Sequence, residues 1–408
     1  MTPRVLIAPS GFKESLGAEE VADCIARGIS RALPDARIQK APLVDGGEGF
    51  TKGLVAATGG TLHDLTVTGP VGQRIQAYYG FLGGADSKTA VLEMASAAGL
   101  RLVPRDARDP LVTTTYGVGE LLKAALDAGA ERVLVGCGDS GTSDGGAGAA
   151  QALGVRLLDG EGRDLGRGGG ELARLEHIDL GGRDRRLERV RIDVACNWHN
   201  VLCGPGGVAP VFGPQKGASP ETVERLAAAL EHYADVIARE PGADVREMPG
   251  GGASGGLGAG LHALLGARLH PRYDIVMRYL DIDELLREAD LVFTAEGGID
   301  SQTPRGKVPA EVARRAKRFG LPVIVLAGTI GKDAHINYAS GIDAFTSILH
   351  APCTLDEAIA RASEMLTDCA ENVMRMVMVG YRLAQQPVSE SDSRRPRYHA
   401  KGGGSWLV

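Results

Sequence analysis

The stretch Gly136-Cys137-Gly138-Asp139-Ser140-Gly141-Thr142-Ser143-Asp144-Gly145-Gly146-Ala147-Gly148 lies between an apolar run, 132–135, and a small-residue segment, 149–154. The run predicts a buried parallel strand, and the segment predicts a helix. A glycine-rich turn at a helix start presents free backbone N–H groups and the positive helix end, which together suit an anionic group. The stretch therefore predicts an α/β fold with an anion site at this turn.

The same stretch leaves its chemistry open. Asp144 can hold a divalent metal that bridges phosphates, or accept a proton from a substrate hydroxyl. Gly136, Gly138 and Gly141 form a G-x-G-x-x-G pattern, which keeps a dinucleotide-binding oxidoreductase under consideration. A tight turn that only packs helix against strand is the third interpretation.

Composition narrows the class of protein. The chain has 408 residues, 44% hydrophobic and 24% charged, which favours a soluble enzyme of two domains. A net charge of −6 argues against nucleic-acid binding. We expect no membrane span, because no apolar run reaches 18 residues. Six scattered cysteines without a CxxC pair indicate free thiols in a cytoplasmic protein and no zinc site.

Further polar loops follow predicted strands. Lys13 and Ser15 come after the strand 5–8, and Asp45 and Glu48 follow a second short strand. The carboxyl ends of such strands are where open α/β sheets bind ligands. Solvated loop positions and helix-start carboxylates are the alternatives at these sites.

A similar loop follows the strand 291–294 and carries two carboxylates, a hydroxyl and two cations. A second glycine-rich loop, 249–258, runs into a helix and is another candidate phosphate cradle. Alternating segments on either side of Gly69–Gly72 predict a hairpin, and we expect a domain crossing near Gly69. There is no Walker A motif, which phosphoryl transfer does not require.

Six motifs together resemble the type I glycerate kinase family, which makes 2-phosphoglycerate. They are PSGFKESL (9–16), VDGGEG (44–49), SGTSDGGAG (140–148), FGPQKGA (212–218), GGASGGLG (251–258) and EGGIDSQTPRGKVP (296–309). They occur in order over nearly the whole chain, from about residue 3 to residue 380. Each motif alone is weak, whereas the set is specific.

The resemblance implies a cytoplasmic, ATP- and Mg²⁺-dependent kinase of D-glycerate, with a small-molecule substrate and possible homo-oligomers. It implies two α/β domains with the site in the cleft: a Rossmann-like domain from 1–70 and 285–384, an inserted domain from 71–284, and a polar tail, 385–408. The candidate catalytic residues are Lys13, Asp45, Asp144 and Lys307, with Asp45 and Asp144 also candidate metal ligands. The candidate ATP-binding residues are Gly138, Ser140, Gly145, Gly146, Lys216, Gly255 and Gly256, and the candidate substrate-binding residues are Ser15, Glu48, Glu296, Asp300 and Ser301.

The chain departs from the family pattern inside these motifs. Acids are lost at Ser10 and Asn197, an acid is gained at Asp139, an asparagine becomes Ser143, and Gly298 replaces an arginine. Arginine is a natural partner of carboxylates and phosphates, so these changes suggest a rewired pocket. Two alternatives therefore stand beside glycerate phosphorylation: a kinase shifted to another hydroxy-acid or phosphonate acceptor, and a non-catalytic relative that binds an anion or nucleotide.

Overall fold

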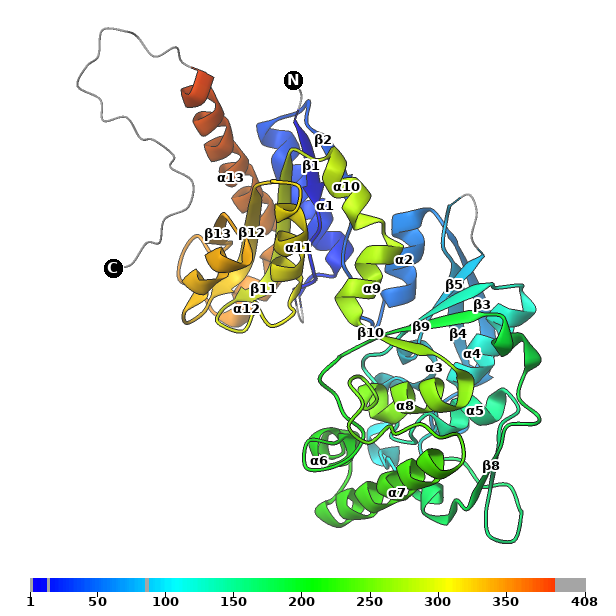
Figure 1. The fold of residues 1–408 in the computed structure, drawn as a ribbon. Helices are drawn as coiled ribbons and strands as arrows, with labels where there is room; N and C mark the ends of the chain where they lie inside the picture. The colour runs from blue at the N-terminus through cyan, green and yellow to red at the C-terminus, as the bar shows by residue number, and fades with distance from the viewer. Residues whose placement is uncertain (1–2, 13–14, 85–87, 386–408) are drawn as a thin grey trace, which may run out of the picture.

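The computed structural model describes residues 3–12, 15–84 and 88–385, and Figure 1 shows two lobes built around separate sheets. The first sheet is parallel throughout, in the order β13-β12-β11-β1-β2. Its strands are β1 (Arg4–Ile7), β2 (Arg37–Lys40), β11 (Leu291–Ile299), β12 (Val323–Ile330) and β13 (Ala344–Ser347). This sheet is assembled from both ends of the chain.

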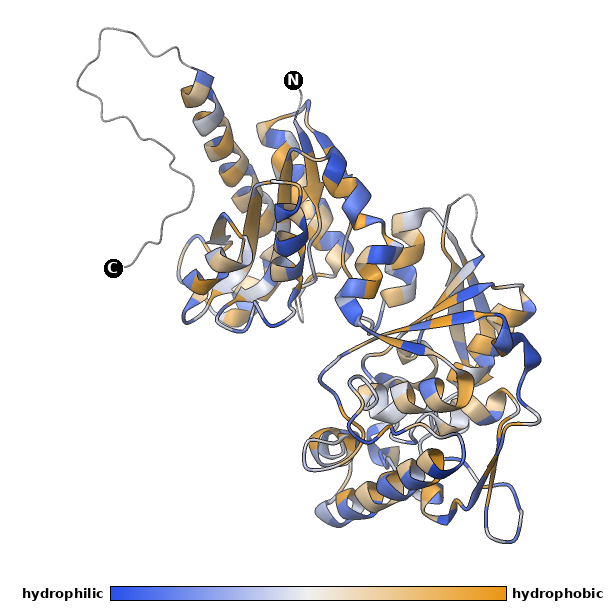
Figure 2. Ribbon diagram, in the orientation of Figure 1, coloured by the Kyte–Doolittle hydropathy of each residue, from blue (hydrophilic) through white to orange (hydrophobic). Residues whose placement is uncertain are grey.

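Helices cover both faces of the first sheet because its central strands β1, β11 and β12 bury consecutive residues, and much of these strands is orange in Figure 2. On one face, Val5 and Ile7 pack against α1 (Ala18–Ala32) and α13 (Ala362–Gln385). On the other, Leu6 and Val292 pack among α9 (Arg272–Tyr279), α10 (Ile282–Glu288) and α11 (Val308–Lys317). The short helix α12 (Leu355–Ala360) precedes α13.

The second sheet has the order β10-β9-β6-β5-β4-β3. The strands β5 (Thr89–Glu93), β6 (Arg132–Gly136), β9 (Arg191–Cys196) and β10 (Arg268–Pro271) are parallel. The strands β3 (Thr61–Thr68) and β4 (Arg74–Phe81) add an antiparallel hairpin at one edge. A separate two-stranded sheet pairs β7 (Arg156–Leu158) with β8 (His177–Asp179).

One face of the second sheet packs against a layer of helices, and the other packs toward the first lobe. The layer contains α3 (Ala95–Ala98), α4 (Tyr116–Asp127), α5 (Ala147–Ala152), α6 (Val208–Phe212), α7 (Pro220–Arg239) and α8 (Ala253–Leu265). On the opposite face, Val91, Leu134 and Ala195 pack with α2 (Phe50–Thr58) and α9. The same hydrophobic cluster continues into the first sheet, so one core joins the two lobes.

The chain passes between the sheets earlier than the sequence predicts. The strand β3 ends at Thr68 and belongs to the second sheet, so the expected crossing at Gly69 is a hairpin turn inside that sheet. The passage lies between Lys40 and Thr61 instead. The proposed boundary at 70/71 therefore separates β3 from its pairing partner β4. The proposed boundary at 284/285 falls inside α10, between β10 and β11.

One further expectation needs adjustment. The strand predicted over 291–294 continues to Ile299, so Glu296 lies in the strand β11 and not in the following loop. None of the helices in the described ranges combines the length and apolar character that a membrane span requires.

Candidate active site

The order of strands in the first sheet reverses between β1 and β11. The chain moves from β1 to β2 in one direction, with α1 on one face, and from β11 to β12 in the other, with α11 on the opposite face. Loops that leave neighbouring strands to opposite faces create a ligand-binding crevice at the carboxyl ends. The loops that follow Ile7 and Ile299 leave from this point, which is the edge at which the sequence predicted a site.

The loop Asp45–Gly49 lies against the carboxyl ends of strands in the second sheet. A Cβ built on Gly46 would lie 3.2 Å from the carbonyl oxygen of Ala195 and 3.3 Å from the Cys137 nitrogen. A Cβ built on Gly138 would lie 2.6 Å from the Cα of Gly47. Only glycine permits these approaches. The glycines after β2 and β6 thus bring the acidic loop of the first lobe onto the glycine-rich loop of the second.

Carboxylates and arginines gather where these loops meet. Asp45 is half exposed, and its Oδ2 lies 3.7 Å from the guanidinium of Arg272, the first residue of α9. The N–H of Glu48 donates to Oδ2 of Asp139 at 2.9 Å, and the Glu48 carboxylate pairs with Arg101 at 2.6 Å. A small anionic substrate would meet both carboxylate acceptors and cationic partners here.

The loop after β11 adds a lysine and two carboxylates. The Nζ of Lys307 lies 3.8 Å from Glu296, 3.7 Å from Asp300, and donates to the carbonyl oxygen of Gly298 at 3.3 Å. Ser301 follows as an exposed residue whose N–H donates to the carbonyl of Lys332. The structure therefore brings Glu296, Asp300 and Lys307 together as the sequence predicted.

The loop after β1 carries the remaining first-lobe candidates. Lys13 lies outside the described residues. The hydroxyl of Ser15 donates to the carbonyl of Ile359 in α12 at 3.4 Å, so it joins the loop to that helix. Ser10, where the family usually has an acid, is buried and donates to the carbonyl of Ala295 at 3.0 Å. The Ser10 side chain thus joins this loop to β11.

Asp144 lies in a different environment from the one predicted. Its side chain is fully buried and accepts hydrogen bonds from the N–H of Thr115 at 2.7 Å and from Gly146 and Gly148 at 3.2 Å. The hydroxyl of Thr115 donates to it as well, at 2.9 Å. Burial raises the pKa of this carboxyl, and the hydrogen bonds oppose that shift. A carboxylate so enclosed joins the starts of α4 and α5, which does not fit the predicted role as base or metal ligand.

Lys216 is also buried. Its Nζ donates to the carbonyl of Thr142 at 2.6 Å and to the hydroxyls of Ser140 at 2.9 Å and Ser143 at 3.4 Å. Burial lowers the pKa of this lysine to about 7, against the opposing effect of the Asp144 charge. The contacts tie Lys216 to the loop that follows β6, so its placement supports that loop from within.

The predicted glycine cradles pack against each other. Gly145 donates its N–H to the carbonyl of Gly255 at 3.1 Å. A Cβ on Gly255 would lie 1.9 Å from the Thr142 carbonyl oxygen, and one on Gly256 would lie 2.8 Å from the Cα of Gly145. Gly146 approaches Leu257 and Gly260 in the same way. These glycines are explained by loop packing, and that geometry does not leave them as an open phosphate cradle.

Sequence reasoning missed Arg272 and Arg101. Glu93 is buried and accepts hydrogen bonds from the N–H groups of Gly49 and Thr51 and the hydroxyl of Tyr78, so it anchors the start of α2. Arg272 follows β10, a strand of only four residues, Arg268–Pro271, which is too short to give a clear periodic signal. Its position at the carboxyl end of a parallel strand is the signal that could have revealed it.

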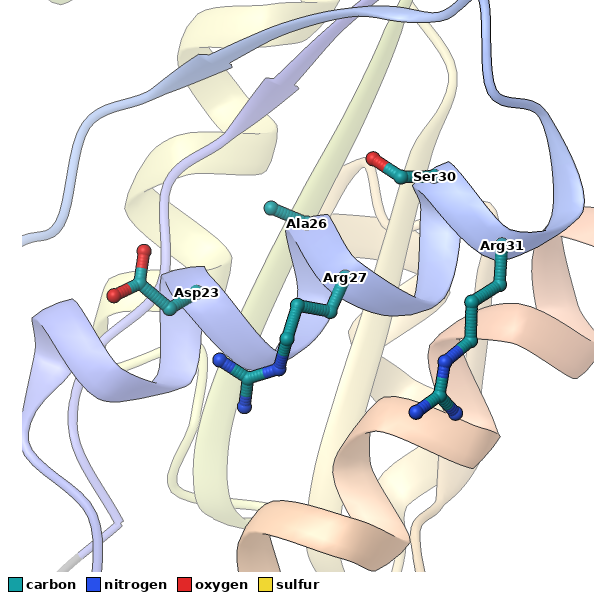
Figure 3. A pocket seen from close by; sticks show the side chains of 5 residues that line it. All are labelled: Asp23, Ala26, Arg27, Ser30 and Arg31. Atoms are coloured by element: carbon teal, nitrogen blue, oxygen red, sulfur yellow. The ribbon is translucent and has the colours of Figure 1, made fainter.

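A separate hollow lies along α1 and is shown in Figure 3. All of its lining residues come from that helix: Asp23, Ala26, Arg27, Ser30 and Arg31. None of the predicted site residues is among them. The candidate site is therefore the edge where the two sheets' carboxyl-terminal loops meet.

Comparison with known proteins gives a consistent answer. The model of the glycerate kinase family matches residues 5–378. The glycerate kinase of Bacillus subtilis is 47% identical over 91% of this chain and 96% of its own length. The glycerate 2-kinase of Escherichia coli is 45% identical over 93% of this chain and 100% of its own length. A solved structure from Salmonella typhimurium LT2 that carries the name glycerate kinase 2 superposes with a TM-score of 0.83 at 47% identity, covering 94% of this chain and 100% of that one. With the family model spanning nearly every described residue and close relatives aligned from end to end, this chain belongs to the glycerate kinase family.

Proposed function

We propose that this protein transfers the γ-phosphoryl group of ATP to a hydroxyl group of D-glycerate. The observation that carries the proposal is the end-to-end match to relatives named glycerate kinase and glycerate 2-kinase. The comparisons give no support to a different acceptor or to a non-catalytic relative, although the motif departures first suggested both. The nicotinamide alternative loses its basis as well, because the glycines that suggested it serve loop packing.

Phosphoryl transfer depends on positioning and on neutralising charge, with a base near the attacking hydroxyl. Asp45 suits the role of base, because it is half exposed and lies at the meeting point of the loops. Lys307 and Lys13 are the proposed cations for the transferring group. Arg272 and Arg101 would balance the carboxylate of glycerate, and Glu48, Glu296, Asp300 and Ser301 are the proposed acceptors for its hydroxyl groups.

The donor set at this edge fits a magnesium ion held partly by phosphates. Among residues of the described ranges, no group of three His, Cys, Asp or Glu side chains forms a complete metal cage. Magnesium in kinases commonly takes only one or two carboxylates, with phosphates and water completing the shell. Asp45 and Asp139 both approach Gly47: a Cβ built there would lie 3.3 Å from Oδ1 of Asp45 and 2.3 Å from Oδ2 of Asp139. We propose Asp139 as the ligand, with Asp45 beside it as the base; bound magnesium would neutralise phosphate charge.

We also propose that the protein acts in the cytoplasm, which is supported by six cysteines that are all free. Light scattering would test the homo-oligomers that the family resemblance implies.

The experiment that tests the proposed function measures ADP release with ATP, Mg²⁺ and D-glycerate, with ³¹P and ¹H NMR identifying the phosphorylated carbon. Turnover with D-glycerate, and much weaker turnover with other 2-hydroxy acids and their phosphonate analogues, is the expected result. Turnover confined to another acceptor would replace the proposal with the rewired-pocket hypothesis. Absence of ADP release from a folded protein that binds ATP would favour the non-catalytic alternative.

A further inference from the structure

A cavity of about 290 Å³ lies at the carboxyl edge of the first sheet. Its floor is formed by Gly297 of β11, Gly328 and Thr329 of β12, and Ile348 after β13. The helix α12 supplies one wall with Leu355 and Ala358. Figure 1 shows α12 close to the lower ends of β11 and β12. The cavity thus occupies the same edge as the charged residues of the candidate site.

The chemistry of the lining separates the cavity from its charged neighbours. Its described lining contains apolar, glycine, hydroxyl and thiol side chains, and no charged residue. A glycerate ion or a phosphate chain would gain no charged partner in such a pocket. Small-molecule pockets that are mainly apolar, with a few polar groups, suit flat and weakly polar ring systems. The volume is near the lower end of the common range of about 300–1,000 Å³.

The cavity is also adjacent to the proposed phosphate-binding residues. Gly297 contributes to the lining, and the next residue, Gly298, accepts the hydrogen bond from Lys307. Ser15, in the loop that carries Lys13, lines the cavity too and donates to Ile359. A ligand with a flat ring in the cavity could therefore extend a charged chain directly toward Lys307.

We propose that this cavity binds the adenine ring of ATP, so that the first lobe holds the nucleotide and its phosphates point toward Lys307. The inference rests on the proposed kinase function and adds to it the location of the nucleotide. Glycerate then binds on the side of Asp45 and Arg272, between the nucleotide and the second lobe.

Cys353 provides a chemical probe for the cavity. It lines the cavity and is exposed, whereas the other five cysteines are buried. The experiment measures the rate of Cys353 alkylation by N-ethylmaleimide, followed by intact mass and peptide mapping. We expect ATP and adenosine each to slow the reaction about tenfold or more at saturation. Inorganic tripolyphosphate and D-glycerate should leave the rate unchanged, because neither carries a ring.

A pair of matched variants gives an independent readout. Ala358→Leu fills the cavity, whereas Ala360→Leu makes the same change at an exposed position of the same helix that is not part of the lining. We expect Ala358→Leu to raise the KM for ATP about tenfold or more without changing the KM for D-glycerate, and Ala360→Leu to change neither. Circular dichroism confirms that both variants fold.

The outcomes distinguish this inference from the proposed function. If the enzyme phosphorylates glycerate, but ATP does not protect Cys353 and Ala358→Leu leaves the KM for ATP unchanged, the nucleotide lies elsewhere and the inference is overturned. Protection by D-glycerate or tripolyphosphate in place of adenosine would overturn it as well. If ATP and adenosine protect Cys353 but no acceptor releases ADP, the nucleotide site stands and the proposed reaction fails.

Discussion

Asp45 and Asp144 were predicted from the sequence to have the same roles, but they lie in opposite environments. Asp45 is half exposed beside Arg272, whereas Asp144 is enclosed by N–H and hydroxyl donors. We predict that Asp45→Asn lowers kcat by about 100-fold or more, as loss of a general base does, with little change in Tm. Asp144→Asn presents an amide group to N–H donors, so we expect it to lower the free energy of unfolding by about 2–4 kcal/mol. Steady-state kinetics and urea unfolding of both variants measure these effects.

The prediction fails at Asp144 if Asp144→Asn keeps its stability and loses turnover, since that result would restore its role in the chemistry. It fails at Asp45 if Asp45→Asn turns over at the normal rate.

The buried side chain of Lys216 leads to a prediction about how stability depends on pH. Its pKa in the folded protein is about 7, whereas an ordinary lysine titrates at about 10.4, so the unfolded chain binds more protons between these values. Stability contributed by this residue must therefore rise with pH above about 7, as the ammonium loses its charge inside the protein beside Asp144. We predict that the deficit of Lys216→Met in the free energy of unfolding is larger at pH 8.5 than at pH 6.5, by about 1–2 kcal/mol. Urea unfolding at the two pH values checks this, and a deficit that is equal at both pH values would show that the lysine remains charged in the folded protein.

At the scale of elements, a buried carboxylate holds the helix α9 at both ends. Asp193 of β9 accepts from the hydroxyl of Tyr279, the last residue of α9, at 2.9 Å. Its other oxygen lies 2.7 Å from Nε2 of His270, two residues before α9 begins. The first residue of that helix is Arg272, which faces Asp45. The position of an arginine in the candidate site thus depends on contacts made at the opposite end of its helix.

We predict that Tyr279→Phe lowers the free energy of unfolding by about 1–3 kcal/mol, because it leaves an oxygen of Asp193 without one of its donors. We also expect it to reduce kcat/KM for D-glycerate, because α9 can then shift at the end that carries Arg272. Tyr338→Phe is the matched control: that tyrosine is exposed and stacks on Phe345. Equal effects of the two substitutions would show that the contact with Asp193 does not hold the helix.

Two helical glycines predict substitutions of opposite sign. A Cβ on Gly28 of α1 would lie 2.3 Å from the carbonyl oxygen of Thr367 in α13, whereas a Cβ on Gly380 of α13 would meet nothing within 4 Å. Gly28→Ala should therefore separate the two helices and lower the free energy of unfolding by about 1–3 kcal/mol. Gly380→Ala should raise it by up to about 1 kcal/mol through helix propensity alone. Thermal unfolding of both variants measures this, and a stabilised Gly28→Ala would contradict the close packing of α1 on α13.

At the scale of the whole molecule, local patterns predicted the α/β class, most strands and the sheet edge at which the candidate site lies. These patterns failed where contacts between distant parts of the chain determine the environment of a residue. The burial of Asp144 depends on Thr115, about 30 residues away, and nothing in the glycine-rich stretch itself reveals that partner. The glycine-rich loops 138–146 and 249–258 suggested a phosphate-binding cradle. Glycines that allow two loops to pack closely cannot be told apart, by sequence alone, from glycines that bind a phosphate. The boundary near Gly69 was misplaced because a hairpin turn and a domain linker share the same residues.

The hydrophobic core shared by the two lobes leads to a prediction about how they unfold. One hydrophobic cluster contains Leu6 and Val292 of the first sheet and Val91 and Leu134 of the second, together with Leu54 of α2. Two lobes that share buried surface of this kind should unfold together, in a single calorimetric transition with equal van't Hoff and calorimetric enthalpies. Leu54→Ala in α2 should cost about 2–5 kcal/mol and broaden or split that transition, since it opens a cavity in the shared cluster.

Leu121→Ala is the control, because Leu121 is equally buried but belongs to the cluster of the second lobe alone. Leu121→Ala should lower the free energy of unfolding by a similar amount, because it leaves a similar cavity. It should still give a single unfolding transition. Two separate transitions in the unmodified protein would mean that each lobe is stable alone and that the cluster does not couple them. A single transition that only Leu54→Ala divides would show that α2, the first helix after the chain leaves the β1–β2 pair, is what makes the two sheets one folding unit. The acidic loop 45–49 precedes this helix directly, so the element that couples the lobes also holds the proposed base at their junction.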